Sequence, residues 1–148
     1  MQAQMLAPAA VLIAWSLIML MMIPPTRFPA LKKLVIDLGN APRGARGADT
    51  EAQMPDRPKW ISHNYAHLME QPTIFYPAVI VIAMMGAAAG DVLAAWIYVG
   101  LRIIHSLWQA FVNIVAVRFA VFLSATLALA YLAYRAVMLT LFAYPGAL

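Results

Sequence analysis

Residues 5–23 read MLAPAAVLIAWSLIMLMMI, a continuous apolar run without a charged side chain. At about 1.5 Å per residue, this run is long enough to cross the roughly 30 Å hydrocarbon core of a bilayer. A secretory signal peptide would begin with basic residues and carry a shorter apolar core, but no Lys or Arg precedes Arg27. We therefore predict a retained transmembrane helix over about residues 5–24, ended by Pro24 and Pro25.

The composition extends this interpretation to the whole chain. Of the 148 residues, 64% are hydrophobic and 11% are charged, whereas soluble domains carry about 25% charged residues. Lipid must cover much of the surface, and backbone groups in lipid need internal partners. Because the apolar runs lack the alternation of barrel strands, we predict an all-α bundle in one domain over 1–148. Its four transmembrane helices are expected at about 5–24, 60–87, 92–113 and 118–143, with a hydrophilic loop at about 26–59.

Several classes of function are excluded by what the sequence lacks. Without cysteine there is no disulfide, thiolate metal site or catalytic thiol, and no metal site is expected. Most of the net charge of +4 comes from one loop, so we interpret it as a topology signal and expect no nucleic-acid binding. The sequence also lacks a glycine-rich phosphate loop, an HExxH helix and a nucleophile elbow.

The distribution of basic residues predicts the orientation in the membrane. Seven of the ten Lys and Arg residues lie between Arg27 and Lys59, the next turn carries none, and the last turn carries Arg118. Basic loops stay in the cytoplasm. We therefore expect a multi-pass protein, of the bacterial inner membrane, with both termini in the periplasm.

Two stripes of polar residues run along the expected second and third helices. Insertion of an ionisable side chain costs at least about 2.5–3.5 kcal/mol at the centre of a membrane helix, so each one needs a reason. The spacing of three or four residues places the members of each stripe on one helix face. The stripes indicate either a polar cavity open to the cytoplasm or polar contacts that hold the helices together. Their members are Asn64, His67 and Glu70, and Arg102, His105, Gln109 and Asn113.

Glu70 and Arg102 are expected at matching depth. Counted from the cytoplasmic ends of their helices, both lie roughly 16 Å into the membrane, and His105 roughly 12 Å. An ion pair between Glu70 and Arg102 would relieve both desolvation costs, so we predict that they pair. Near the opposite face, we interpret Arg135 with its neighbouring tyrosines as snorkelling plus an aromatic belt. These tyrosines are Tyr131, Tyr134 and Tyr144.

Two segments resemble the MAPEG superfamily, the membrane-associated proteins in eicosanoid and glutathione metabolism. Residues 63–76, HNYAHLMEQPTIFY, resemble its second-helix signature. Residues 98–106, YVGLRIIHS, with Asn113 and residues 117–119, VRF, resemble its third helix and the turn that follows. The pattern is most similar to an uncharacterised bacterial branch. The resemblance implies a homotrimer that binds glutathione between subunits near the cytoplasmic side and takes lipophilic small molecules from the bilayer.

The resemblance also implies roles for individual residues. Arg118 matches the arginine that lies near the glutathione sulfur in active members, and is the expected catalytic residue. Departures from the family pattern occur at His67, where asparagine is usual, and at Gln109, where tyrosine is common. Phe119 and Phe122 replace a serine and a tyrosine, which removes hydroxyls that would stabilise a thiolate. The expected glutathione-binding residues are Asn64, His67, Glu70, Arg102, His105 and Gln109.

Three functions remain open at this point. The first is a glutathione-dependent transferase or peroxidase that acts on lipophilic electrophiles. The second is a non-catalytic trimeric accessory or lipid-binding scaffold subunit, in contact with membrane lipids and, as one alternative, part of a larger membrane complex. The third is a b-type haem or quinone protein, because His67 and His105 have similar expected depths and imidazoles are good axial ligands.

Reporter fusions test the predicted topology. A reporter fused after Ala48 should report a cytoplasmic location, and one fused at the C-terminus a periplasmic one, because the basic loop should stay inside. The reverse pattern would contradict both the orientation and the depths derived from it.

Overall fold

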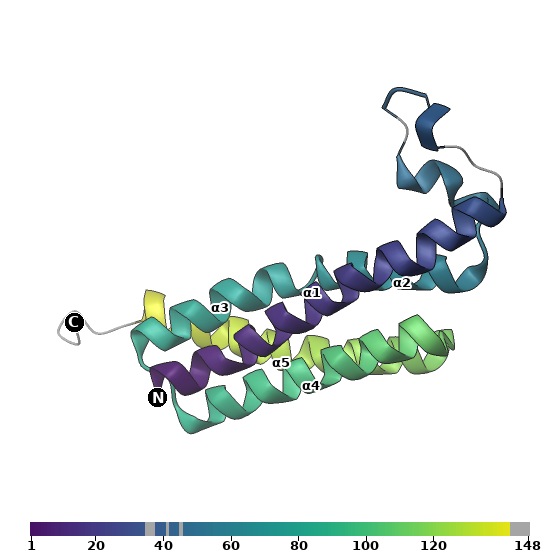
Figure 1. Ribbon diagram of the computed structural model, residues 1–148. Coiled ribbons are helices and arrows are strands. Elements are labelled where there is room, and N and C mark those ends of the chain that lie inside the picture. The colour runs from purple at the N-terminus through teal and green to yellow at the C-terminus, as the bar shows by residue number, and fades with distance from the viewer. Residues whose placement is uncertain (35–37, 41, 45, 143–148) are drawn as a thin grey trace.

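A computed structural model describes residues 1–34, 38–40, 42–44 and 46–142 of the chain. In these residues, four stretches are long and apolar enough to cross a membrane, which supports an integral multi-pass membrane protein. The second stretch consists of two helices, and two short 3-10 helices, η1 and η2, belong to the loop before it (Figure 1). The elements are α1 (Gln2–Lys33), η1 (Leu38–Asn40), η2 (Gly47–Gln53), α2 (Asp56–Leu68), α3 (Pro72–Met85), α4 (Ala89–Phe111) and α5 (Val115–Leu141).

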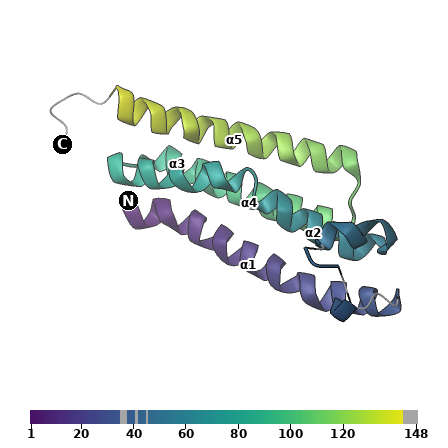
Figure 2. The same cartoon turned by 90° about the horizontal axis from the view of Figure 1, so that it is seen from above.

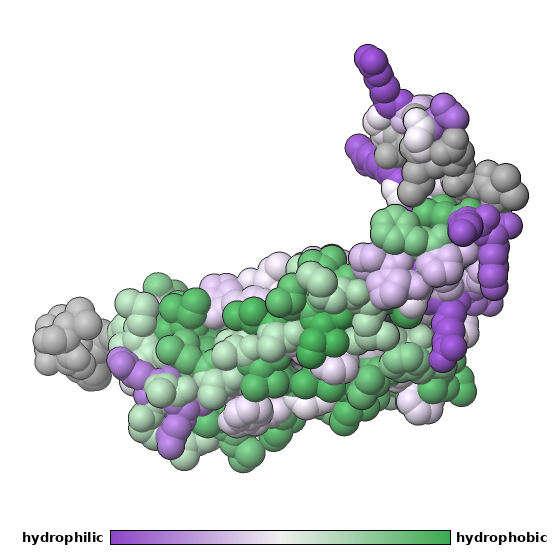
Figure 3. Space-filling view, in the orientation of Figure 1, coloured by the Kyte–Doolittle hydropathy of each residue, from purple (hydrophilic) through white to green (hydrophobic). Residues whose placement is uncertain are grey.

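The two outer helices of the bundle are α1 and α5. Seen from above, they lie on opposite sides, with α2, α3 and α4 between them (Figure 2). Accordingly, α1 packs on α2, α3 and α4, whereas α5 packs on α3 and α4. Hydrophobic residues cover most of the visible bundle, and hydrophilic residues gather over the loop end, with a smaller group at the opposite end (Figure 3). This distribution fits a bilayer around the middle of the bundle.

The first helix is longer than the sequence predicted. Pro24 and Pro25 do not end α1, which continues to Lys33. The hydroxyl of Thr26 donates to the carbonyls of Met22 and Ile23, at 2.8 and 3.0 Å. These bonds lie within one turn of the prolines, whose missing N–H groups leave the carbonyls of Leu20 and Met21 free. The extension also has tertiary support, because α1 packs on α2 and buries Ala30 and Leu31. The sequence also predicts a short amphipathic turn at the membrane surface over residues 31–38. Residues 31–33 belong to α1, and residues 35–37 lie outside the described residues.

The second membrane stretch is broken, where one helix over 60–87 was predicted. α2 ends at Leu68 and α3 begins at Pro72. Proline lacks the N–H that would bond to the carbonyl of Leu68, and its ring would clash with that carbonyl in a continuous helix. At the first position of a new helix the same residue is favourable. Pro72 therefore explains where the helix breaks.

The turn between the last two helices depends on Asn113. Its φ of 58° is in the left-handed region, which Asn tolerates better than most residues. The N–H of Asn113 donates to the carbonyl of Trp108, at 2.7 Å, and closes the end of α4. α5 then begins at Val115, before the predicted start at 118. The predicted end at 143 lies outside the described residues.

A buried carboxylate joins α4 to α5 at the end opposite the loop. Asp91 is fully buried and binds the Nε and Nη2 atoms of Arg135, at 2.8 and 3.1 Å. The hydroxyl of Tyr131 and the N–H of Ala88 also donate hydrogen bonds to the Asp91 carboxylate, at 3.1 and 2.9 Å. Arg135 therefore has a buried ionic partner, Asp91, which was not expected from the sequence. Tyr144 of the predicted belt lies outside the described residues.

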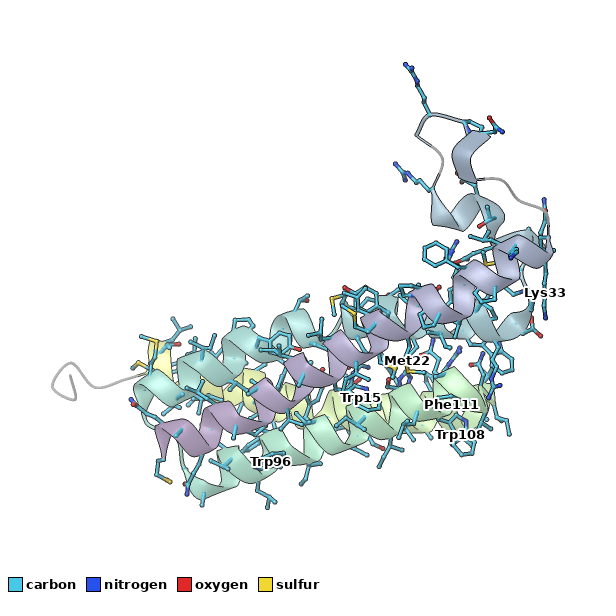
Figure 4. The ribbon with its side chains drawn as sticks, in the orientation of Figure 1. Trp15, Met22, Lys33, Trp96, Trp108 and Phe111 are labelled. Atoms are coloured by element: carbon cyan, nitrogen blue, oxygen red, sulfur yellow. The ribbon has the colours of Figure 1, made fainter. Side chains whose placement is uncertain are left out.

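Ser106 joins three helices near the middle of the bundle. Its hydroxyl oxygen accepts hydrogen bonds from the indole of Trp15 on α1, at 2.9 Å, and from the amide of Asn64 on α2, at 2.8 Å. Figure 4 shows Trp15 between the ribbons of α1 and α4. Ser106 and Asn64 are completely buried, so neither bond can be replaced by water without opening the core.

Ser106→Ala should lower the free energy of unfolding by roughly 1–3 kcal/mol, because the change leaves buried donors on Trp15 and Asn64 without an acceptor. Ser124→Ala is the matched control, since the Ser124 hydroxyl is exposed and bonds only to Ala120 of its own helix. Thermal or denaturant unfolding in mild detergent measures both variants. Equal stability of the two would show that the three-helix contact at Ser106 does not hold the bundle together.

Candidate functional site

A cavity of about 210 Å³ lies between α2, α4 and the first two turns of α5. Its wall combines a cation, two imidazoles and three apolar side chains. It lies toward the loop end of the bundle, the end at which Figure 4 places Trp108 and Phe111 of α4. The lining residues are His67, His105, Val115, Arg118, Phe119 and Phe122.

Arg118 is held at the cavity by the turn that precedes it. Its Nη1 donates to the side-chain oxygen of Asn113, at 2.7 Å. Arg118 lies in the first turn of α5, where the unpaired N–H groups give the helix a positive end. A guanidinium stays charged at every working pH. The positive end of α5 and the charged guanidinium of Arg118 together make this side of the cavity favourable for an anion.

His67 forms the opposite wall and is paired with a carboxylate. Its Nδ1 lies 2.8 Å from the Oε2 atom of Glu70, and the side chains are 36% and 60% exposed respectively. Because Leu68 ends α2, Glu70 lies in the turn before Pro72 and can fold back onto His67. The His67 ring also meets the His105 ring edge to face, with centroids 6.0 Å apart.

Arg102 is buried behind this wall, at 1% exposure. Its Nη2 donates to the backbone carbonyl of His67, which lies at the broken end of α2. Carbonyls at a helix end lack intrahelical partners and carry partial negative charge. The predicted ion pair between Glu70 and Arg102 was therefore wrong as a contact: Arg102 binds a carbonyl and Glu70 binds an imidazole. The two charges interact only through space.

The remaining predicted residues divide between the cavity and the core. His105 lines the cavity, and its ring lies 6.0 Å from that of Phe122. Asn64 is buried against Ser106 and the sulfur of Met19, at 3.1 Å. Gln109 is buried, and its Oε1 has no partner in the described part of the chain. Of the two polar stripes, His67 and His105 line the cavity, whereas Asn64, Arg102 and Gln109 lie buried in the core.

Two features of the site were not expected from the sequence. Val115 lines the cavity because α5 starts before Arg118, and an apolar residue in a turn gives no signal of this. Gln71 ties the break to α5, since its Nε2 donates to the hydroxyl of Thr126, at 2.8 Å. A Gln directly before a proline within an apolar run is a signal that could have drawn attention to this tether.

A comparison with protein-family models identifies the chain: the model described as the MAPEG family matches residues 5–138. The chain belongs to the MAPEG family. MAPEG proteins commonly use glutathione and are typically trimeric. No curated protein and no solved structure matches the chain.

The MAPEG chain offers two acid–arginine pairs for a double-mutant cycle. Asp91→Asn with Arg135→Met should show coupling of about 2 kcal/mol or more, because each single change leaves a polar partner in an apolar environment. Glu70→Gln with Arg102→Leu should show weaker coupling, because the two side chains do not touch and interact only through space and through their shared partner His67. Unfolding in detergent measures both cycles. Stronger coupling for Glu70 and Arg102 than for Asp91 and Arg135 would contradict the contacts described above.

Proposed function

We propose that this MAPEG protein binds glutathione with its thiol in the cavity at Arg118 and transfers it to lipophilic electrophiles. One observation carries the proposal: a fixed guanidinium faces a cavity whose other walls are aromatic rings and imidazoles. Such a cavity suits two different reactants at once. The cation attracts a thiol that develops negative charge, while Phe119, Phe122 and Val115 suit an apolar acceptor.

The residues present fit glutathione, which carries carboxylates, amides and an ammonium group. The structure has unsatisfied buried atoms of both kinds. The Nε and Nη1 atoms of Arg102 are donors without partners, and the side-chain oxygens of Asn64 and Gln109 are acceptors without partners, among the described residues. Buried polar groups normally find a partner. The cavity itself is smaller than the roughly 300–1,000 Å³ of a site for a drug-sized ligand, so it would take the thiol end alone.

The role of each residue follows from its chemistry. Bound glutathione supplies a thiol, whose sulfur forms a bond to the electrophilic carbon as the leaving group departs with its electron pair. Arg118 stabilises the negative charge on sulfur with a donor that is already in place. Asn113 orients Arg118, and the apolar wall excludes water from the cavity. The family resemblance assigns the polar parts of the tripeptide to Arg102, Gln109 and Asn64, which lie buried and do not line the cavity of the single subunit.

The same proposal includes the assembly and the orientation. A homotrimer would place a second subunit against the small cavity and supply the remaining part of the tripeptide site. The basic loop would lie in the cytoplasm, so a soluble thiol could reach the cavity from that side. We also infer that the chain belongs with the bacterial MAPEG members that the segment at 63–76 resembles.

The alternatives are less well supported by the geometry. A haem between His67 and His105 would need space that the two rings occupy, because they meet edge to face. The scaffold function has one observation in its favour. Phe119 and Phe122 offer no hydrogen bond to sulfur, so thiolate stabilisation rests on fewer groups. This predicts weak glutathione binding and broad, slow activity.

Glutathione at millimolar concentration should raise the melting temperature of the purified protein, because a ligand that binds only the folded state stabilises it. Arg118→Ala should lower the rate with a model aryl halide by about a hundredfold, the size of effect seen when one preorganised donor is lost. Arg118→Lys should keep part of the activity, since the charge remains.

Arg57→Ala is the matched control. Arg57 lies over the Phe111 ring at the same end of the bundle but does not line the cavity, so its loss should leave the rate unchanged. If the wild-type protein shows neither a thermal shift nor heat with glutathione, the transferase proposal fails and the scaffold function takes its place.

A further inference from the structure

We propose that His67 is the general base of this site, with Glu70 as its positioning residue. The inference rests on the proposed function and adds a step that Arg118 cannot perform. A guanidinium has no acceptor and does not release its proton, so it can stabilise a thiolate but cannot take the proton from a thiol. A base at the cavity could accept that proton directly, within hydrogen-bonding reach of the thiol.

The cavity offers two bases, and only one has a carboxylate partner. Of the six lining residues, only His67 and His105 carry a side-chain nitrogen with a lone pair that can accept a proton. The carboxylate of Glu70 contacts His67, at 2.8 Å. In the described part of the chain, no carboxylate contacts His105, whose ring meets those of His67 and Phe122. The geometry therefore favours His67.

The Glu70 contact also determines which nitrogen is free. A carboxylate oxygen accepts, so the Nδ1 atom of His67 must carry the hydrogen in this bond. The neutral ring then has its lone pair on Nε2, the nitrogen that Glu70 does not occupy. When Nε2 gains a proton, the negative charge of Glu70 stabilises the imidazolium. A carboxylate that orients a histidine and balances its charge is a recurring arrangement in general-base catalysis.

The backbone holds His67 in place from behind. Its carbonyl accepts from Arg102, and its position one residue before the end of α2 follows from the break at Pro72. Glu70 lies in the turn before Pro72, and its N–H shares the His67 carbonyl with Arg102, at 3.4 Å for the Glu70 bond. The side chain and the main chain of His67 are therefore both held in place. A general base needs such positioning, because it acts at hydrogen-bonding distance.

The proposed step balances as follows. His67 Nε2 accepts the proton as the S–H bond breaks, and Arg118 faces the charge that develops on sulfur. The sulfur electron pair forms the bond to the electrophilic carbon, and the leaving group takes the electron pair of the bond that breaks. The proton then leaves Nε2 for water, and the neutral ring is restored. No oxidant or reductant takes part.

The test separates proton transfer from binding. Bound thiolate is measured by its ultraviolet difference absorbance with glutathione, and binding by the thermal shift with S-methylglutathione, which has no thiol proton. His67→Asn should abolish the thiolate signal at neutral pH and keep the S-methylglutathione shift. Its rate with an aryl halide should fall by about a hundredfold, the lower end for loss of a general base. Glu70→Gln should lower the thiolate signal in part.

His63→Asn is the matched control, because His63 lies on the same helix and also contacts a glutamate, Glu51, at 3.0 Å, but does not line the cavity. It should leave both readouts unchanged. A full thiolate signal in His67→Asn would overturn the role of His67 while the transferase function stands. Loss of S-methylglutathione binding in both His67→Asn and His67→Gln would also overturn it, since His67 would then be a binding residue. Failure of the wild-type protein to bind either thiol compound would reject the base and the proposed function together.

Discussion

The structure of the site depends on one missing hydrogen bond. Pro72 has no N–H to donate to the carbonyl of Leu68. In lipid, a backbone group without a partner is costly, so a break in a membrane helix must be compensated by neighbours. Here Arg102 donates to the carbonyl of His67, one residue before the carbonyl that Pro72 leaves free. A hydrogen bond to a charged group contributes about 1.5–3 kcal/mol, and placing an arginine at the centre of a membrane helix costs about 2.5–3.5 kcal/mol. The two are similar in size, so one contact offsets much of the cost of burying Arg102.

The residues at the break join the two sides of the cavity. In a continuous helix, Glu70 would also lie near His67, because side chains three residues apart share a helix face. In the broken one, Glu70 lies in the turn and contacts His67, while Gln71 ties the turn to α5 through Thr126. α5 carries Arg118, so the same few residues connect the two sides of the cavity. The chemistry proposed for the site therefore depends on how the second membrane stretch folds.

Much of this could be predicted from the sequence, because the strongest signals are long and local. Four apolar stretches predicted four membrane-spanning stretches, and all four are present. The helical spacing of Arg102, His105 and Gln109 predicted that they share a face, and all three are buried. The helix ends were less accurate: α1 passes through Pro24 and Pro25 because packing of Ala30 and Leu31 supports it.

Partner choice could not be predicted, because depth along a helix does not fix direction around it. Glu70 and Arg102 were expected to pair because their depths match. Glu70, in the turn before Pro72, contacts His67 instead. Asp91 and Arg135 are 44 residues apart in sequence. They meet because α4 packs on α5, and neither segment carries a sequence pattern that predicts this contact. The role of Asn113 in holding Arg118 needs the left-handed turn, which was likewise not evident from the residues.

The most direct measurement for the cavity uses the absence of cysteine from the chain. Val115→Cys places a single thiol of similar size in the cavity wall, and Val117→Cys places one in the same turn of α5 but outside the wall. The rate of modification by a small maleimide is measured for each variant with and without S-methylglutathione. The account predicts that the ligand slows modification of the Val115→Cys variant in proportion to occupancy and leaves the Val117→Cys variant unchanged. The contradicting result is that S-methylglutathione, at a concentration that raises the melting temperature, leaves the modification rate of the Val115→Cys variant unchanged. Glutathione would then not lie at Arg118 and His67.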